Sequence, residues 1–386
     1  MDSGGGAEAS GLGATPQPLS GHRVNRTGKT SDAVNFPNRQ QLLMDRMSSK
    51  FLHRFSVLLA VATFILICSG GLVTSKGVGM SVPDWPTTYG YNMFLFPFSK
   101  WVGGIFHEHL HRLIASTVGF LTVTLCIWLW ISEKRAWLKH VGVIAVFAVI
   151  LQGVLGGQRV ALNRAEIGIF HGCLAQSFLL LTSFIALVTS NWWKTTRLAS
   201  DPAKSFARIG LFLTSLIFIN MAVAATMRHS HTGLSIPDFP TAYGQILPPL
   251  DPQTLEEINT DRIAHNIPET TSTLIALQFI HRLIAYFLAV AVLWFSYRLF
   301  KSGGVLKNWA MLFPVLIAIQ ITLGAWTIWS NKAADIATAH VAIGASIFIL
   351  SGLITIIGYR ACWDAKRPGS TRKSVETPPN LAEIAG

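Results

Sequence analysis

The sequence predicts an all-α polytopic membrane protein with eight transmembrane helices. Of its 386 residues, 51% are hydrophobic and only 13% are charged, a balance that is unusual for a soluble domain. The apolar residues also form runs that can cross ~30 Å of hydrocarbon, which takes about 20 helical residues. No pattern of short strands and turns competes with them, and a helix satisfies its own backbone hydrogen bonds in lipid.

The first span is FSVLLAVATFILICSGGLV, which begins at Phe55. Seven further apolar segments follow, at residues 105–131, 141–160, 167–191, 207–227, 273–299, 309–330 and 336–359. We therefore expect an N-terminal half of four helices at 51–191 and a C-terminal half of four helices at 206–360. Tails at 1–50 and 361–386 flank the two halves.

The positions of Lys and Arg predict the orientation, because cytoplasmic segments carry the excess of these residues. Of the 31 Lys and Arg, 22 lie in the two tails and in the links 132–140, 192–208 and 298–308, and seven lie in the alternate loops. Both termini are thus expected in the cytoplasm, with the protein in a bacterial plasma membrane; the mitochondrial inner membrane is the less favoured alternative. The same bias explains the net charge of +12 without nucleic acid.

The first 50 residues are rich in Gly, Ser and Asn and lack an apolar core. This composition favours a disordered cytoplasmic tail over a cleaved signal peptide. The four cysteines show neither the spacing of a metal site nor a CxxCH haem-attachment motif, and none lies in an outer loop. We therefore expect no structural disulfide on the oxidising side of the membrane.

The chain contains an internal duplication. Val82-Pro-Asp-Trp-Pro-Thr-Thr-Tyr-Gly90 recurs as Ile236-Pro-Asp-Phe-Pro-Thr-Ala-Tyr-Gly244, His-Arg-Leu-Ile-Ala recurs at 111–115 and 281–285, and Leu-Gln-Gly-Val-Leu-Gly at 151–156 matches Ile-Gln-Ile-Thr-Leu-Gly at 319–324. Each half has an even number of helices, so both halves enter and leave on the same side. This predicts two four-helix bundles related by a pseudo-two-fold axis along the membrane normal, rather than the inverted repeat of many transporters.

Four histidines occupy matching positions of the duplication: His111, His171, His281 and His340. They fall on the second, fourth, sixth and eighth spans, within the first turns after the outer surface. A histidine inside an apolar span is costly and usually functional, and histidine pairs on facing helices commonly hold haem iron. The alternative is that each one is a hydrogen-bonded packing residue, which a duplicated set of four disfavours. The pattern therefore predicts one haem site in each half.

Glu108 distinguishes the two sites, because it lies three residues before His111 on the same helix face. Its counterpart before His281 is Gln278. An acid beside one iron and an amide beside the other suggests reaction in the first half and electron transfer or storage in the second; a solvated residue at the helix mouth is the alternative for Glu108. A di-iron carboxylate centre would need more acidic ligands than the sequence places there.

Arginines near the histidines are candidate partners for haem propionates, since a guanidinium matches a carboxylate in a bidentate pair. The candidates are Arg112, Arg282, Arg159, Arg164 and Arg228. His107 could bind substrate or a transient metal, although a surface role is as plausible for it, and His229 and His231 are expected to be loop residues. We interpret the two Pro-Asp-aromatic-Pro segments as lids in which Asp84 or Asp238 caps a turn. The acidic segment 251–269 could dock a partner or form a solvated helix.

Residues 51–360 resemble the haem A synthase family of cytochrome oxidase assembly. The resemblance rests on Glu108-His-Leu-His111-Arg112, His171, Gln278-Phe-Ile-His281-Arg282, His340, the duplicated halves and the stretch from Gly79 to Pro97. It implies oxidation of a ring methyl of haem O to the formyl group of haem A. By this resemblance, His111 and His171 would bind the substrate haem with Glu108 as the catalytic residue, and His281 and His340 would bind a haem b that relays electrons.

One feature departs from the family. Many relatives carry a cysteine pair in the first outer loop, but residues 75–104 contain no cysteine. A redox disulfide can therefore play no part there. The expected partners are haem O, membrane lipid, an electron donor and haem O synthase, with a homo-oligomer as an open alternative. Rival functions are a di-haem b-type electron-transfer protein and a haem-binding transporter or assembly factor.

Overall fold

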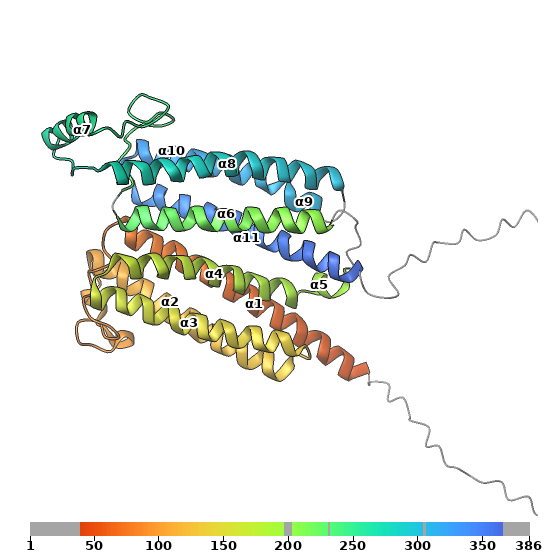
Figure 1. The fold of residues 1–386 in the computed structure, drawn as a ribbon. Helices are drawn as coiled ribbons and strands as arrows, with labels where there is room; N and C mark the ends of the chain where they lie inside the picture. Colours follow the sequence, from red (N-terminus) through yellow and green to blue (C-terminus); the bar gives the residue numbers. More distant parts are fainter. Residues whose placement is uncertain (1–38, 197–202, 231, 304–305, 366–386) are drawn as a thin grey trace, which may run out of the picture. The chain divides into compact units, whose positions relative to one another are not determined.

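The computed structural model describes residues 39–196, 203–230, 232–303 and 306–365, and these residues fold into helices joined by loops. From Met44 onward the chain forms one compact unit, in which the long helices lie side by side (Figure 1). The long helices are α1 (Arg39–Ser75), α2 (Gly103–Ser132), α3 (Ala136–Leu162), α4 (Ala165–Thr189), α6 (Ala203–His229), α8 (Ser272–Ser302), α10 (Leu312–Trp329) and α11 (Ala334–Ala365). Shorter helices are η1 (Met93–Leu95), η2 (Phe98–Lys100), α5 (Asn191–Thr195), α7 (Pro252–Ala264) and α9 (Leu306–Ala310).

The prediction of eight spans is confirmed: within the described ranges, eight helical segments are long and apolar enough to cross a membrane. Most extend a few residues beyond the apolar runs, and α1 begins at Arg39. Of the predicted tails, residues 1–38 and 366–386 lie outside the described residues.

Many large apolar side chains point away from the protein. Phe120, Phe147 and Val290 are 71%, 69% and 71% exposed. A soluble monomer rarely exposes so much apolar surface, whereas lipid tails contact such side chains without cost. The protein is therefore a multi-pass membrane protein.

Each half of the sequence has its own hydrophobic core. Leu59 and Phe178 belong to the cluster built by α1, α2, α3 and α4. Leu213, Phe295 and Phe348 belong to the cluster built mainly by α6, α8, α10 and α11. The arrangement as two bundles related by a two-fold axis stays a prediction.

The two halves meet chiefly through α4, which contacts both α6 and α11. Gly352 of α11 allows a close approach, because a Cβ atom there would lie 2.6 Å from Cδ1 of Leu180 on α4. Gly71 of α1 likewise faces Thr338 of α11, whose Cγ2 would lie 3.3 Å from an added Cβ. Small residues at these contacts let apolar helices pack closely in a membrane.

The duplicated loops fold in the same way. Asp84 accepts hydrogen bonds from the main-chain N–H groups of Tyr89 (2.7 Å) and Gly90 (2.9 Å), and Asp238 accepts the equivalent bonds from Tyr243 and Gly244 at the same distances. Both tyrosines have positive φ, and the aromatic–Pro peptide bond is cis in both loops. The prediction that these aspartates cap a turn is thus confirmed.

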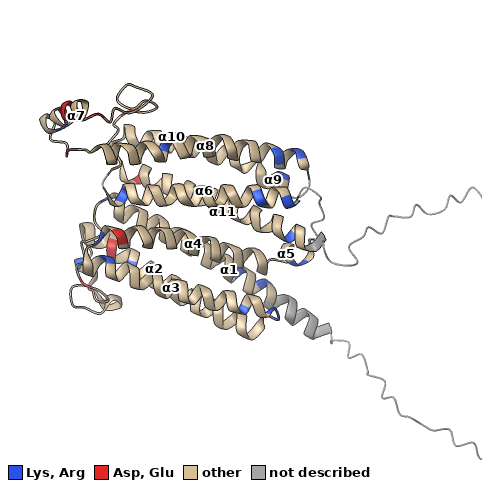
Figure 2. Cartoon of the chain, in the orientation of Figure 1, with Lys and Arg blue, Asp and Glu red and all other residues tan. Residues whose placement is uncertain are grey.

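We call the end of the helices that carries residues 76–102 and 232–271 the loop end. The 16 additional residues of the second loop, compared with the first, include α7, a helix with mostly exposed or half-buried residues. Figure 2 shows Asp and Glu on α7, whereas Lys and Arg gather at the opposite end of the long helices. The distribution agrees with the charge bias of the sequence, and the orientation itself stays a prediction.

Candidate functional site

The four predicted histidines lie on α2, α4, α8 and α11, the four long helices that begin at the loop end (Figure 1). Each histidine is at most nine residues from the start of its helix, or about 14 Å at 1.5 Å per residue. His111 and His171 are close enough to interact electrostatically, and so are His281 and His340. The structure therefore brings the histidines together in the two predicted pairs.

Three of the imidazoles rest on glycines that line the site. A Cβ atom added to Gly70 of α1 would lie 2.9 Å from Cε1 of His111, a distance that forces the ring to move. In α3 and α10, a Cβ on Gly156 would lie 3.3 Å from His171, and one on Gly324 would lie 3.1 Å from His340. The glycines thus set how far each ring can lean toward its neighbouring helix.

The ring nitrogens of the four histidines are the strongest sign of a ligand. In each of them Nδ1 is buried and forms no hydrogen bond, although each residue as a whole is only partly buried. A buried polar atom without a partner costs free energy, so such atoms usually have a function. Paired imidazoles with unused nitrogens fit haem, whose iron takes histidine as an axial ligand.

Two repeated glutamines lie beside the histidines, and the sequence analysis did not single them out. Gln152 donates a hydrogen bond from Nε2 to the main-chain oxygen of His171 (3.0 Å). Nε2 of Gln320 lies 3.3 Å from Nε2 of His340. The Oε1 atoms of both glutamines are buried without a partner. Their shared position in the Leu-Gln-Gly and Ile-Gln-Ile repeats was the signal that could have identified them.

Glu108 holds the first loop. It is 3% exposed, and its Oε2 accepts a hydrogen bond from the N–H of Val82 (2.9 Å) while its Oε1 pairs with Arg112 (2.8 Å). Arg112 also donates to the main-chain oxygens of Val82, Asp84 and Thr87. These interactions fix the start of the loop against α2.

The second half repeats this arrangement without the acid. Gln278 accepts a hydrogen bond from the N–H of Ile236 (2.8 Å) and returns one to its carbonyl oxygen (3.1 Å). Arg282 donates to the main-chain oxygens of Ile236, Asp238 and Thr241. Propionate pairing by Arg112 and Arg282 stays a prediction, and their guanidinium groups already serve the loops.

The remaining histidines near the first site have different surroundings. His109 is 1% exposed; it contacts Thr88 and packs against the rings of Phe96 and Trp101, which gives it a structural role in the first loop. Nε2 of His107 lies 2.8 Å from Nζ of Lys76.

The prediction that His229 is a loop residue is wrong, because it is the last residue of α6 and faces Gly168 of α4, one turn before His171. Gly168 has no room for a Cβ, which would lie 2.4 Å from Cε1 of His229. His231 lies outside the described residues.

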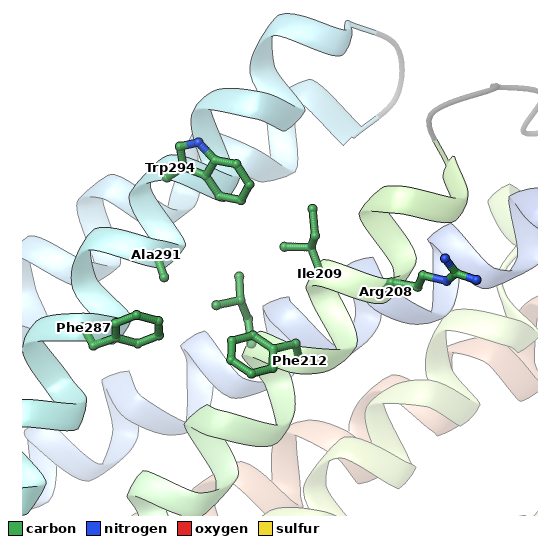
Figure 3. Close-up of a pocket in the computed structure, with 7 residues that line it drawn as sticks. Arg208, Ile209, Phe212, Phe287, Ala291 and Trp294 are labelled. Atoms are coloured by element: carbon green, nitrogen blue, oxygen red, sulfur yellow. The ribbon is translucent and has the colours of Figure 1, made fainter.

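The described residues offer no cluster of three or more His, Cys, Asp or Glu side chains that could hold a metal ion. The four cysteines, Cys68, Cys126, Cys173 and Cys362, form no disulfide among the described residues. Two apolar grooves lie elsewhere. One, of about 420 Å³, lies between α6 and α8 and is lined by Phe212, Phe287 and Trp294 (Figure 3). The other, of about 470 Å³, lies between α1, α4 and α11. Neither is lined by the four histidines.

Residues 53–351 match the family described as cytochrome oxidase assembly protein. The chain is 26% identical to "Heme A synthase" of Shouchella clausii over 294 residues, which cover 74% of this chain and 89% of that protein. It is 25% identical to "Heme A synthase" of Listeria monocytogenes serotype 4a over 327 residues, or 81% and 97% of the two chains. The protein of that name from Bacillus cereus is 24% identical over 335 residues, or 85% and 99%. This chain therefore belongs to the haem A synthase family of cytochrome oxidase assembly proteins.

Proposed function

We propose that this membrane oxidoreductase converts haem O to haem A for cytochrome oxidase assembly. The proposal rests on membership of the family, which matches most of the chain. The single structural observation that carries it is the four buried Nδ1 atoms without partners, in two facing pairs of histidines. In the reaction, two successive two-electron oxidations convert a ring methyl to a geminal diol, with the four electrons passing to an external oxidant, and loss of water then yields the formyl group.

His111 and His171 are the proposed ligands of the substrate haem. Their position beside Glu108, the acid near one histidine pair and absent from the other, supports this assignment. Gly70 and Gly156 support it further, because they leave the imidazoles room at the walls of α1 and α3.

His281 and His340 are the proposed ligands of a resident haem b, which would supply reversible one-electron transfer when bound. Gln278 and Gln320 place only neutral amides near these rings. A site without an acid–base group suits electron relay better than oxidation of a substrate.

Glu108 is the proposed catalytic residue of the first half. Its carboxylate is buried, paired with Arg112 and three residues from His111, which places it one turn along the same helix. The hydrogen bond to Val82 also links it to the loop above the site. Glu108 would therefore hold a proton or a negative charge near the substrate while the loop limits the entry of water.

The proposal is tested by pigment extraction from cells that produce this protein together with a haem O synthase. Haem A should accumulate, and the variant with Ala in place of both His111 and His171 should leave haem O unchanged. A di-haem electron-transfer protein or a haem transporter would give haem B and haem O in unchanged amounts in both strains. Such a result with well-folded, haem-containing protein would overturn the assignment.

A further inference from the structure

Three basic side chains gather at the loop end where the two halves meet. They are Arg159 of α3, Arg228 of α6 and Lys332, which lies between α10 and α11. Arg228 is close enough to repel both Arg159 and Lys332. None of the three takes part in a salt bridge with any other residue that the structure describes.

The contacts of the two arginines position them without neutralising their charge. Arg228 donates from Nη2 to the main-chain oxygen of Gly71 (2.5 Å) and to Oγ of Ser75, both on α1. Arg159 donates to the main-chain oxygen of Gly79 (3.3 Å). Glu108 is near enough for Arg159 to feel its charge, but both of its carboxylate oxygens already have partners.

The pKa of Lys332 reflects the nearby positive charge of Arg228. Burial, and then the charge of Arg228, hold the pKa of Lys332 below its ordinary value of 10.5. Three neighbouring cations without a counter-ion repel one another, so an anion bound among the three groups would relieve that repulsion.

The two arginines of the cluster lie close to residues that contact the first histidine pair. Arg159 is one turn from Gly156, the glycine against which His171 rests, and its charge reaches both His111 and His171. Arg228 binds the carbonyl of Gly71, the neighbour of the glycine that contacts His111. The second half therefore places a guanidinium at the edge of the site in the first half.

We propose that Arg159, Arg228 and Lys332 form one anion site that binds the carboxylates of the porphyrin held by His111 and His171. The inference rests on the proposed function and extends it, because it makes two residues of the second half, Arg228 and Lys332, part of the substrate site in the first. Guanidinium groups bind carboxylates in bidentate pairs, and Lys332 adds a third positive charge at the exposed rim. The first half alone would then lack part of its substrate site.

The test compares ferric haem b with its dimethyl ester, in which both carboxylates are neutral, by titration of the full chain followed in the Soret band. The second site is disabled with His281→Ala and His340→Ala so that only the first site is measured. The protein should bind haem more tightly than the ester. Arg228→Gln should weaken haem binding about tenfold, equivalent to about 1.4 kcal/mol, and leave ester binding unchanged.

Lys100→Gln is the matched control, since Lys100 is an exposed cation at the same end of the helices, and it should change neither affinity. If the background variant does not fold, the same titration is made on the chain that retains its second-site histidines and resident haem. The anion site would be overturned if Arg228→Gln weakened the binding of haem and of its dimethyl ester equally. It would also be overturned if the unsubstituted first site bound haem and the dimethyl ester with equal affinity. Failure of the first site to bind either porphyrin would instead overturn the proposed function.

Discussion

Glu108 and Gln278 perform the same mechanical task with different chemistry. Each side chain accepts a hydrogen bond from the residue that precedes a Pro-Asp-aromatic-Pro segment. An amide is therefore sufficient to hold the loop, and the carboxylate in the first half adds a charge that the loop does not need. This separation allows the two roles of Glu108 to be tested independently.

The variant Glu108→Gln should keep the loop in place, because Gln278 shows that an amide makes the required bond. Loss of a group that moves a proton typically lowers a rate by roughly 10²-fold or more. We expect haem A production to fall by at least this factor, while the absorbance of the resident haem and the amide exchange of residues 82–90 remain normal. Undiminished haem A would show that the carboxylate is dispensable; rapid exchange in the loop would show that the substitution acted by releasing it.

A second residue-scale prediction concerns the glycines under the imidazoles. Gly70→Ala places a Cβ 2.9 Å from His111, whereas helix propensity favours Ala over Gly by about 1 kcal/mol. The helix should remain stable and the first site should lose affinity for haem, measured by Soret titration. Gly119→Ala is the control, because nothing lies within 4 Å of an added Cβ there. Equal affinities in the two variants would show that His111 does not depend on the space at Gly70.

The duplicated loops are the elements that the sequence predicted least completely. The aspartate turns could be predicted because Asp followed by aromatic, Pro and Gly residues has a local preference for such bonds. The anchoring of Val82 by Glu108 could not, because it joins residues 26 positions apart and depends on where the chain returns after η1 and η2. The role of His109 was missed for the same reason, since its aromatic partners come from that irregular segment.

In the first loop, Asp84 should stabilise the turn at Tyr89 and Gly90, whose N–H groups it binds. Burial raises the pKa of its carboxyl, but hydrogen bonds from Gly90, Thr87 and Tyr89 outweigh that effect and hold the pKa below its ordinary value of 3.8. A carboxyl whose pKa is lower in the folded state than in the unfolded state stabilises the folded state at pH values above its unfolded-state pKa. This stabilisation is lost as the pH falls through the folded-state pKa. Protection of the Tyr89 and Gly90 amides should therefore persist at neutral pH and decline progressively as the pH falls below about 4.

Asp84→Asn should weaken the same protection at neutral pH by about 1 kcal/mol, the usual net contribution of a hydrogen bond. Hydrogen exchange followed by mass spectrometry would measure the effect on residues 82–91. Asp238→Asn serves as the companion variant and should affect only residues 236–245, because Asp238 makes the equivalent bonds in the second loop. Unchanged exchange in both variants would contradict the role given to the aspartates.

The number and positions of the membrane-spanning helices could be predicted from the sequence, because a chain that crosses a bilayer must do so as long apolar helices. Spans of about 20 apolar residues are visible in any sequence that must cross a bilayer, and the eight helices followed from them. Contacts between the halves were not predictable, because they depend on single small residues such as Gly352 whose surroundings are apolar everywhere. The close approach of Arg228 to α1 was equally hidden, since charge alone does not show which helix end an arginine reaches.

The contact between α4 and α11 should govern the stability of the assembled halves. Gly352→Val introduces a Cβ 2.6 Å from Leu180, and overpacking of this kind typically costs about 1–3 kcal/mol. The melting temperature of the purified protein should fall, and the haem proposed for the second half should be released at a lower temperature. Gly153→Val is the control for a β-branched residue in a helix, because an added Cβ at Gly153 meets nothing within 4 Å. Equal melting temperatures would show that this crossing is not tightly packed.

The self-contained anchoring of the two duplicated loops has a consequence for how such a protein can change. The side-chain hydrogen bonds that fix residues 82–90 end on α2 or inside the loop, and those that fix residues 236–244 end on α8 or inside the loop. A substitution that changes one of these loops therefore leaves the hydrogen bonds of the other loop unchanged. The side chain that anchors one loop can therefore be an acid and the side chain that anchors the other an amide, without a matching change between the halves.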